Sequence, residues 1–125
     1  MKKYAIIVLV LIVFLAGCST KKTLKDGRYV PKDGNDETAV PYLLVQEGEM
    51  HVIQDIAISF QPSGDLVIDG DEVSMDCVWF NDQNCRWVFR LTGNNTLEFQ
   101  LDKSTVPAGT EQLWTDGMVF VLAKG

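Results

Sequence analysis

The sequence predicts an all-β domain, an antiparallel meander of about eight strands that forms a small barrel or a strongly curved sheet. Two observations support this fold class. Short apolar segments recur along the chain with turn-forming residues between them, which is typical of β-sandwiches and barrels. In addition, three consecutive segments can be paired so that all of their apolar side chains share one face.

Eight segments are expected to form strands, and each break between them contains Gly, Pro, Asn or Asp or is charged. The third segment lacks strict alternation, so it is expected to be a bent strand or a strand with one helical turn. In order, the segments are residues 27–30, 40–46, 50–60, 65–69, 72–80, 85–92, 96–102 and 118–123.

The fifth and sixth segments are predicted to form a hairpin with its turn at Asn81. One face of this hairpin is apolar and the other carries two opposite-charge pairs, so the register is well specified. The inward pairs are Val73 with Phe89, Met75 with Trp87 and Cys77 with Cys85; the outward pairs are Glu72 with Arg90, Ser74 with Val88 and Asp76 with Arg86.

A second hairpin, around Asn94, extends the same two faces to a third strand. The side chains predicted to fill the interior are Val73, Met75, Trp87, Phe89, Leu91, Leu97 and Phe99, which argues against a large ligand cavity. The pairs expected across this hairpin are Phe89 with Phe99, Leu91 with Leu97, Trp87 with Leu101, Arg90 with Glu98 and Arg86 with Asp102.

Cys77 and Cys85 face each other in this register, a position where a disulfide can form. Export would supply a compartment that permits it. The expected stabilisation is about 2 to 3 kcal/mol on the chain-entropy model. The alternative is a pair of free thiols.

The first residues, "MKKYAIIVLVLIVFLAG", have the basic start, short apolar run and small residues of a secretory signal peptide. "LAGC" at Leu15 to Cys18 resembles the lipobox of bacterial lipoproteins. The resemblance implies cleavage before Cys18, a diacylglyceryl group on its thiol and usually a further acyl chain, such as palmitate, on the new amino terminus. Such chains anchor a protein stably to a membrane. The alternative is an ordinary thiol at Cys18.

The expected organisation is a signal peptide over residues 1–17, a lipidated cysteine with a polar tether over 18–26, and one β domain over 27–125. Lys2 and Lys3 leave with the signal, so nine of the 11 Lys and Arg residues remain against 17 Asp and Glu, a net charge of −8. This charge argues against nucleic acid as a partner. It is compatible with a cationic partner.

No catalytic, metal or cofactor site is expected. His51 is the single histidine, and nothing near it resembles an activated nucleophile. Structural zinc usually takes four protein ligands, which the cysteine pair and His51 do not supply. The chain is therefore expected not to be an enzyme.

The connection from Lys103 to Asp116 is long for a compact domain and carries Val106, Leu113 and Trp114. Loops of this length are often functional, and an exposed aromatic can anchor a partner. The alternative is that Trp114 plugs one end of the barrel.

Several short motifs together resemble a group of small, largely uncharacterised β-rich lipoproteins of low-GC Gram-positive bacteria. The motifs are "DGRY" at 26–29, "SFQPSG" at 59–64, "GDEV" at 70–73, "WVFRL" at 87–91, "TLEF" at 96–99 and "DGMVF" at 116–120. The resemblance implies a lipocalin-like barrel or meander without supplying a ligand.

Three functions are compatible with these features. The first is a non-enzymatic module that binds an envelope protein or polymer. The second is a lipocalin-like carrier of a small apolar molecule, and the third is an inhibitor of a cationic host enzyme such as lysozyme, suggested by acidity, export and a small β fold.

Overall fold

The computed structural model describes residues 22–32, 41–54 and 61–123. Eight strands and three short 3₁₀ turns lie within these ranges. The strands are β1 (Gly27–Pro31), β2 (Tyr42–Gln46), β3 (Glu49–Ile53), β4 (Ser63–Asp69), β5 (Glu72–Trp79), β6 (Gln83–Gly93), β7 (Thr96–Phe99) and β8 (Val119–Leu122); the turns are η1 (Phe80–Asp82), η2 (Leu101–Lys103) and η3 (Glu111–Leu113).

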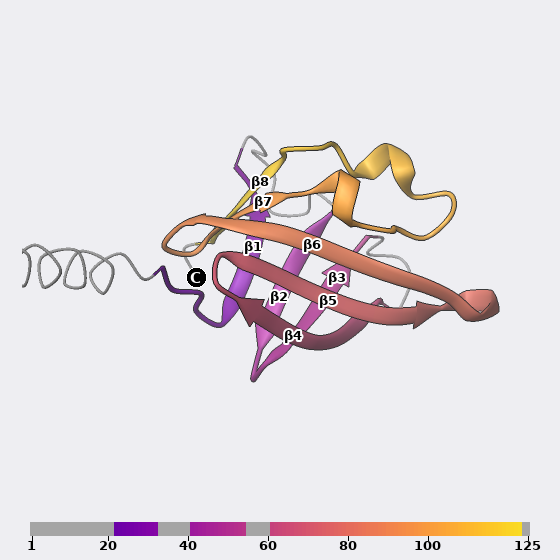
Figure 1. The fold of residues 1–125 in the computed structure, drawn as a ribbon, viewed down its shortest axis with the longest axis horizontal. Helices are drawn as coiled ribbons and strands as arrows, with labels where there is room; N and C mark the ends of the chain where they lie inside the picture. The colour runs from indigo at the N-terminus through magenta and orange to yellow at the C-terminus, as the bar shows by residue number, and fades with distance from the viewer. Residues whose placement is uncertain (1–21, 33–40, 55–60, 124–125) are drawn as a thin grey trace, which may run out of the picture.

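The strands form a closed barrel in sequence order, with every neighbouring pair antiparallel and β8 paired to β1 (Figure 1). The predicted fold class is therefore confirmed as a small closed barrel, and the open curved sheet is excluded. Because the strands alternate in direction, the β2–β3, β4–β5 and β6–β7 turns lie at one end, where the chain enters β1. We term this the entry end, and the opposite end, which carries η1, the tip end.

Alternate residues of each strand point inward and form one continuous core. All seven predicted interior residues are in it and are at most 2% exposed. The aromatic rings meet at edges or at a tilt, as for Phe89 and Phe120, whose centroids are 5.9 Å apart. The further buried side chains of the core are Tyr29, Leu43, Val45, Met50, Val52, Cys85, Trp114 and Phe120.

The β5–β6 register agrees with every predicted pair, including Cys77 with Cys85. In the β6–β7 hairpin, the pairs at Phe99, Glu98 and Leu97 are confirmed. The predicted pairs at Leu101 and Asp102 are wrong, because β7 ends at Phe99 and the chain turns into η2.

Two side chains hold the chain in this turn. The Asp116 carboxylate accepts a hydrogen bond from the Leu101 amide at 3.0 Å, and the Ser104 hydroxyl donates to the Gln100 carbonyl at 2.7 Å. Leu101 is consequently 44% exposed rather than inward. The strand edge that Asp102 was expected to cover is instead bridged by Thr105, which pairs with Arg86.

Gly64 marks a close approach between β4 and β5. A Cβ atom at this position would collide with the carbonyl oxygen of Asp76. Only glycine fits here, because it alone has no side chain to place between the two backbones.

Candidate functional site

The chain that enters the barrel lies against the β6–β7 turn. The Asn95 amide donates to the Thr23 carbonyl at 2.8 Å, and the Thr23 amide donates to Asn94 Oδ1 at 3.2 Å. The Lys25 amide donates to Asn95 Oδ1 at 2.7 Å, and Leu24 packs against the core. The tether expected over residues 18–26 is therefore shorter, because residues 23–25 belong to the folded domain.

Tyr29 connects this segment to the barrel interior. Its hydroxyl donates to the Lys25 carbonyl at 2.6 Å, while its ring is fully buried. Burial raises the pKa of Tyr29 to about 12, with a smaller contribution in the same direction from Asp26, and the hydrogen bond to Lys25 opposes the rise. The phenol therefore stays neutral and remains a donor over the physiological range.

At the opposite end, β5 and β6 continue beyond their neighbouring strands. The pairing of β4 with β5 stops at Met75, whereas β5 and β6 remain paired as far as Trp79 and Gln83. We term residues 76–86 the hairpin tip; it projects from the barrel as a ribbon that ends in η1 (Figure 1). The Thr105 bridge to Arg86 supports one edge of this ribbon.

The hairpin tip carries exposed apolar side chains. Val78 is 62% exposed and Phe80 is 57% exposed, whereas Trp79 between them packs partly against the core. The rings of Trp79 and Phe80 are 4.6 Å apart in an edge-to-face arrangement. Large apolar groups that gather at one projecting feature are typical of an interaction surface.

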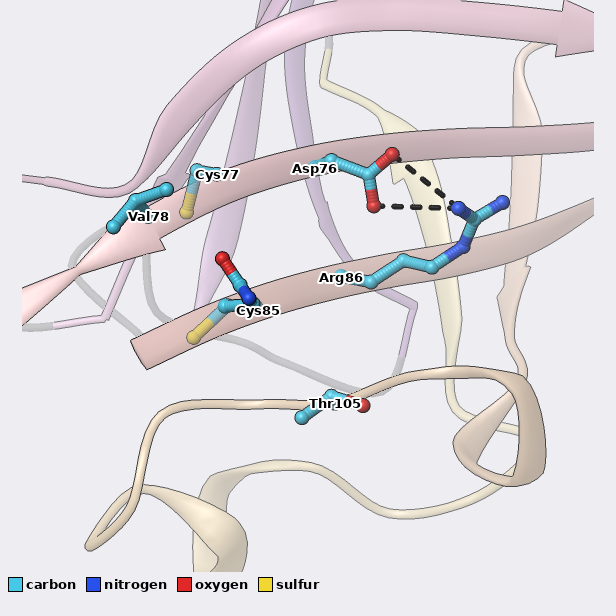
Figure 2. Close-up of a pocket in the computed structure, with 7 residues that line it drawn as sticks. Asp76, Cys77, Val78, Cys85, Arg86 and Thr105 are labelled. Atoms are coloured by element: carbon cyan, nitrogen blue, oxygen red, sulfur yellow. Dashed lines mark hydrogen bonds and ion pairs between the residues drawn. The ribbon is translucent and has the colours of Figure 1, made fainter. Parts of the chain in front are cut away.

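A groove of about 450 Å³ lies along the hairpin tip (Figure 2). Arg86 and Asp76 form an ion pair in it, with Nη1 and Oδ2 3.3 Å apart. Both side chains are partly exposed, so the pair contributes little to stability and remains available to a partner. The groove is lined by Asp76, Cys77, Val78, Asn84, Cys85, Arg86 and Thr105.

Cys77 and Cys85 are directly paired across the hairpin tip, as the sequence predicted, but in the structure both are free thiols. Figure 2 shows the two side chains on neighbouring strands, and their direct pairing places them on the same face of the hairpin. The pKa of Cys77 is raised to about 11, mainly by burial and to a smaller extent by the neighbouring Cys85 and Asp76, while a backbone hydrogen bond from Ser63 opposes the rise. Burial also raises the pKa of Cys85. Neither thiol has the lowered pKa of a catalytic cysteine.

Trp114 is not an exposed binding residue. It is 3% exposed and packs against Phe99, with ring centroids 4.9 Å apart. Its indole N–H donates to Gln54 Oε1 at 3.0 Å. The structure thus supports the alternative in which Trp114 plugs the barrel, and this corrects its assignment to a binding loop.

The other two residues of the predicted binding loop are half-buried. Val106 and Leu113 pack against the core beside Trp114. The loop is tied to β6 through Gln83, whose side chain accepts a hydrogen bond from the Ala108 amide at 3.2 Å. The connection from 103 to 116 is therefore a cover over the barrel. The two most exposed large apolar side chains of the described residues, Val78 and Phe80, lie on the hairpin tip instead, and others are exposed at Val67, Ile68 and Leu101.

His51 lies on β3 near the carboxylate of Glu49, with Nε2 3.7 Å from Oε2. Within residues 22–32, 41–54 and 61–123, no group of three or more His, Cys, Asp or Glu side chains is arranged to hold a metal ion. The same ranges contain no helix long and apolar enough to span a membrane.

The sequence did not reveal two of these features. The segment at Thr23 to Lys25 has no strand periodicity, and only the Asn94-Asn95 pair signalled a site able to bind backbone groups. The second feature is the indole N–H of Trp87, which is buried in the barrel and has no hydrogen-bond partner among the residues that the structure describes.

The model of the prokaryotic membrane lipoprotein lipid attachment site matches residues 1–19. The lipobox interpretation is thereby supported, and the chain is a lipid-anchored lipoprotein whose β-barrel domain lies outside the cytoplasm. No curated protein and no solved structure matches the chain.

This anchor limits how far the barrel can move from the membrane. With lipid on Cys18, as the sequence predicts, the chain from there to Thr23, which is hydrogen-bonded to the barrel, would span at most about 18 Å when fully extended. Lipid at this position would hold the entry end near the membrane surface. The hairpin tip lies at the opposite end of the barrel, with its exposed Val78 and Phe80.

Proposed function

We propose that this lipoprotein is a non-enzymatic interaction module of the cell envelope, and that its hairpin tip binds another exported protein. The observation that carries the proposal is the exposure of Val78 and Phe80 at the end opposite the anchored segment. Exposed apolar and aromatic groups on a projecting feature are typical anchors at protein interfaces.

The charge around the tip indicates the chemistry of the partner. Asp82 is exposed beside the apolar residues, and the mature chain carries a net charge of −8. We therefore expect a partner with an apolar cleft rimmed by basic residues. Complementary charges of this kind mainly increase the rate of association and exclude acidic surfaces.

Site-specific photo-crosslinking in cells tests the proposal. A photoreactive residue is placed at Val78 of the full-length lipoprotein, with Val67 as the matched control because it is 54% exposed on β4. We expect one protein species to be captured from position 78 and not from 67, and Phe80→Ser to abolish the capture. Equal capture from both positions, or no capture from 78, would contradict the proposal.

A carrier function has one specific observation in its favour. The N–H of Trp87 inside the barrel lacks a partner among the described residues, and the oxygen of a small apolar ligand would satisfy it. Native mass spectrometry of the protein extracted from its membrane tests this. A bound small molecule that disappears in Trp87→Phe would support a carrier, and an apo mass in both would argue against it.

Inhibition of a cationic enzyme is supported only by the acidic charge and by export. Lysozyme activity measured at low salt with the purified lipoprotein tests it, and unchanged activity would contradict it. The resemblance to lipoproteins of low-GC Gram-positive bacteria stays a prediction.

A further inference from the structure

We propose that Cys77 and Cys85 form a modification site, in which a disulfide made after export closes the base of the hairpin tip. The proposal goes beyond the binding function, because it holds whether or not the tip engages a protein.

The register gives this pair a backbone geometry that permits a disulfide. The Leu91 amide donates to the Asp71 carbonyl at 2.6 Å, and from there the β5–β6 register runs unbroken to the cysteines. Every second pair is then hydrogen-bonded, and Cys77 with Cys85 is one of these. The Cα atoms of such pairs are about 5.5 Å apart, which is within the range that disulfides use.

The side chains of Cys77 and Cys85 are also oriented in a way that permits a disulfide. Because Cys77 and Cys85 are directly paired, their side chains lie on the same face of the hairpin, and rotation about the Cα–Cβ bonds can bring the sulfur atoms toward each other. The Cys85 thiol makes only a weak contact with the Gln83 carbonyl, at 3.9 Å, which does not oppose such a rotation.

The pair lies at the boundary between the barrel and the hairpin tip. On one side the register pairs of β4 and β5 end at Met75, and Ser63 of β4 makes a last backbone hydrogen bond to Cys77; on the other side the Thr105 bridge reaches β6 at Arg86. Beyond the cysteines, the described part of the sheet consists of β5 and β6 paired with each other. Two-stranded ribbons are marginally stable in water. A covalent link at this boundary would therefore hold together the part of the sheet that has the fewest neighbours.

The chemistry needs an oxidant, and the proposal names a disulfide donor such as an exported thiol oxidoreductase. One thiolate attacks the donor disulfide to give a mixed disulfide and releases one donor thiol. The second cysteine displaces the other donor thiol, so that two protein thiols lose two protons and two electrons and the donor is reduced to its dithiol. Because both thiols have raised pKa values, spontaneous reaction is slow and a catalyst is expected.

Thiol counting on the full-length lipoprotein tests the modification. Membranes are quenched with acid and labelled with a maleimide before and after reduction. Cys18 carries lipid on its sulfur and does not react, so we expect no label before reduction and two labels after it. Two labels before reduction would overturn the proposal.

Amide hydrogen exchange tests the effect on the hairpin tip. We expect amides of residues 78–84 to exchange roughly tenfold more slowly in the oxidised than in the reduced protein. The Cys77→Ala/Cys85→Ala variant is the control: adding reductant should not change the exchange rate of any of its amides. Identical exchange in the oxidised and reduced wild-type protein would contradict the role in holding the tip.

Discussion

The Asn95 amide donates a hydrogen bond to the carbonyl oxygen of Thr23, with 2.8 Å between nitrogen and oxygen. This contact joins the segment that follows the lipid anchor to the β6–β7 turn, 72 positions further along the chain. Asn95 adopts a positive φ of 54°, a conformation that asparagine tolerates better than most residues. Its backbone and its side chain both serve the same attachment.

Asn95→Gly is expected to weaken this attachment. It retains the positive φ but removes the oxygen that accepts the Lys25 amide, so we expect a loss of about 1 to 2 kcal/mol in the free energy of unfolding. Urea denaturation measures this loss. Asn95→Asp keeps an acceptor at the same place and should lose less; equal losses in the two variants would show that the side-chain contact is unimportant.

Tyr29 makes stability depend on alkaline pH. Its pKa rises from 10.0 to about 12 on folding, so folding favours the neutral phenol. The stabilisation is fully present below pH 10 and is lost as the pH rises through about 12. The shift corresponds to at most about 2 to 3 kcal/mol.

The difference in unfolding free energy between wild type and Tyr29→Phe, measured from pH 8 to 12, isolates this effect. The difference should shrink above pH 10, because only the wild type has a phenol at position 29 to ionise. A difference that stays constant with pH would contradict the assignment. Tyr42→Phe, which keeps the ring under the Arg28 guanidinium, is the control.

Gly64→Ala is expected to destabilise the barrel. The added methyl group would collide with the Asp76 carbonyl, a backbone atom that cannot move without shifting β5. We expect a loss of about 1 to 3 kcal/mol by thermal or urea unfolding. Gly93→Ala is the matched control, since its Cβ would meet Thr96 only at 3.8 Å and should be nearly neutral.

Trp114→Ala is expected to reduce stability by about 3 to 5 kcal/mol, because it leaves a cavity and removes the partner of Gln54. Leu113→Ala, at a half-buried neighbour, should cost about 1 kcal/mol. If Trp114 were instead a binding anchor, Trp114→Phe would abolish capture by the tip while the protein stayed folded. We expect capture to persist.

The sequence was most informative where strands pair locally. The β5–β6 hairpin was predicted residue by residue, because its charged and apolar side chains permit only one register. The β6–β7 prediction failed beyond Phe99, where the strand is ended by the Asp116 side chain. Such a contact joins residues distant in sequence and leaves no periodic pattern.

The same distinction applies to the candidate site. The pairing of the two cysteines could be predicted from the strand register. The exposure of Val78 and Phe80 could not, because an apolar residue near a turn is expected to be buried unless the positions of the neighbouring strands are known. The projection of the hairpin tip depends on where β4 and β7 end. Those ends are set by the whole barrel.

Closure of the sheet into a barrel affects how copies of a membrane-anchored protein can associate with one another. Lipoproteins confined to a surface meet one another far more often than molecules in free solution, and an open sheet offers backbone groups that a neighbour can pair with. Pairing β8 to β1 removes those open edges. β6 extends beyond the end of its partner β7, and there the covering loop pairs with it at Thr105. Two residues later the loop has the buried Pro107, which has no N–H with which to continue the strand pairing. Along the strands that the structure describes, the closed barrel therefore offers crowded copies fewer backbone edges to pair with than an open sheet would.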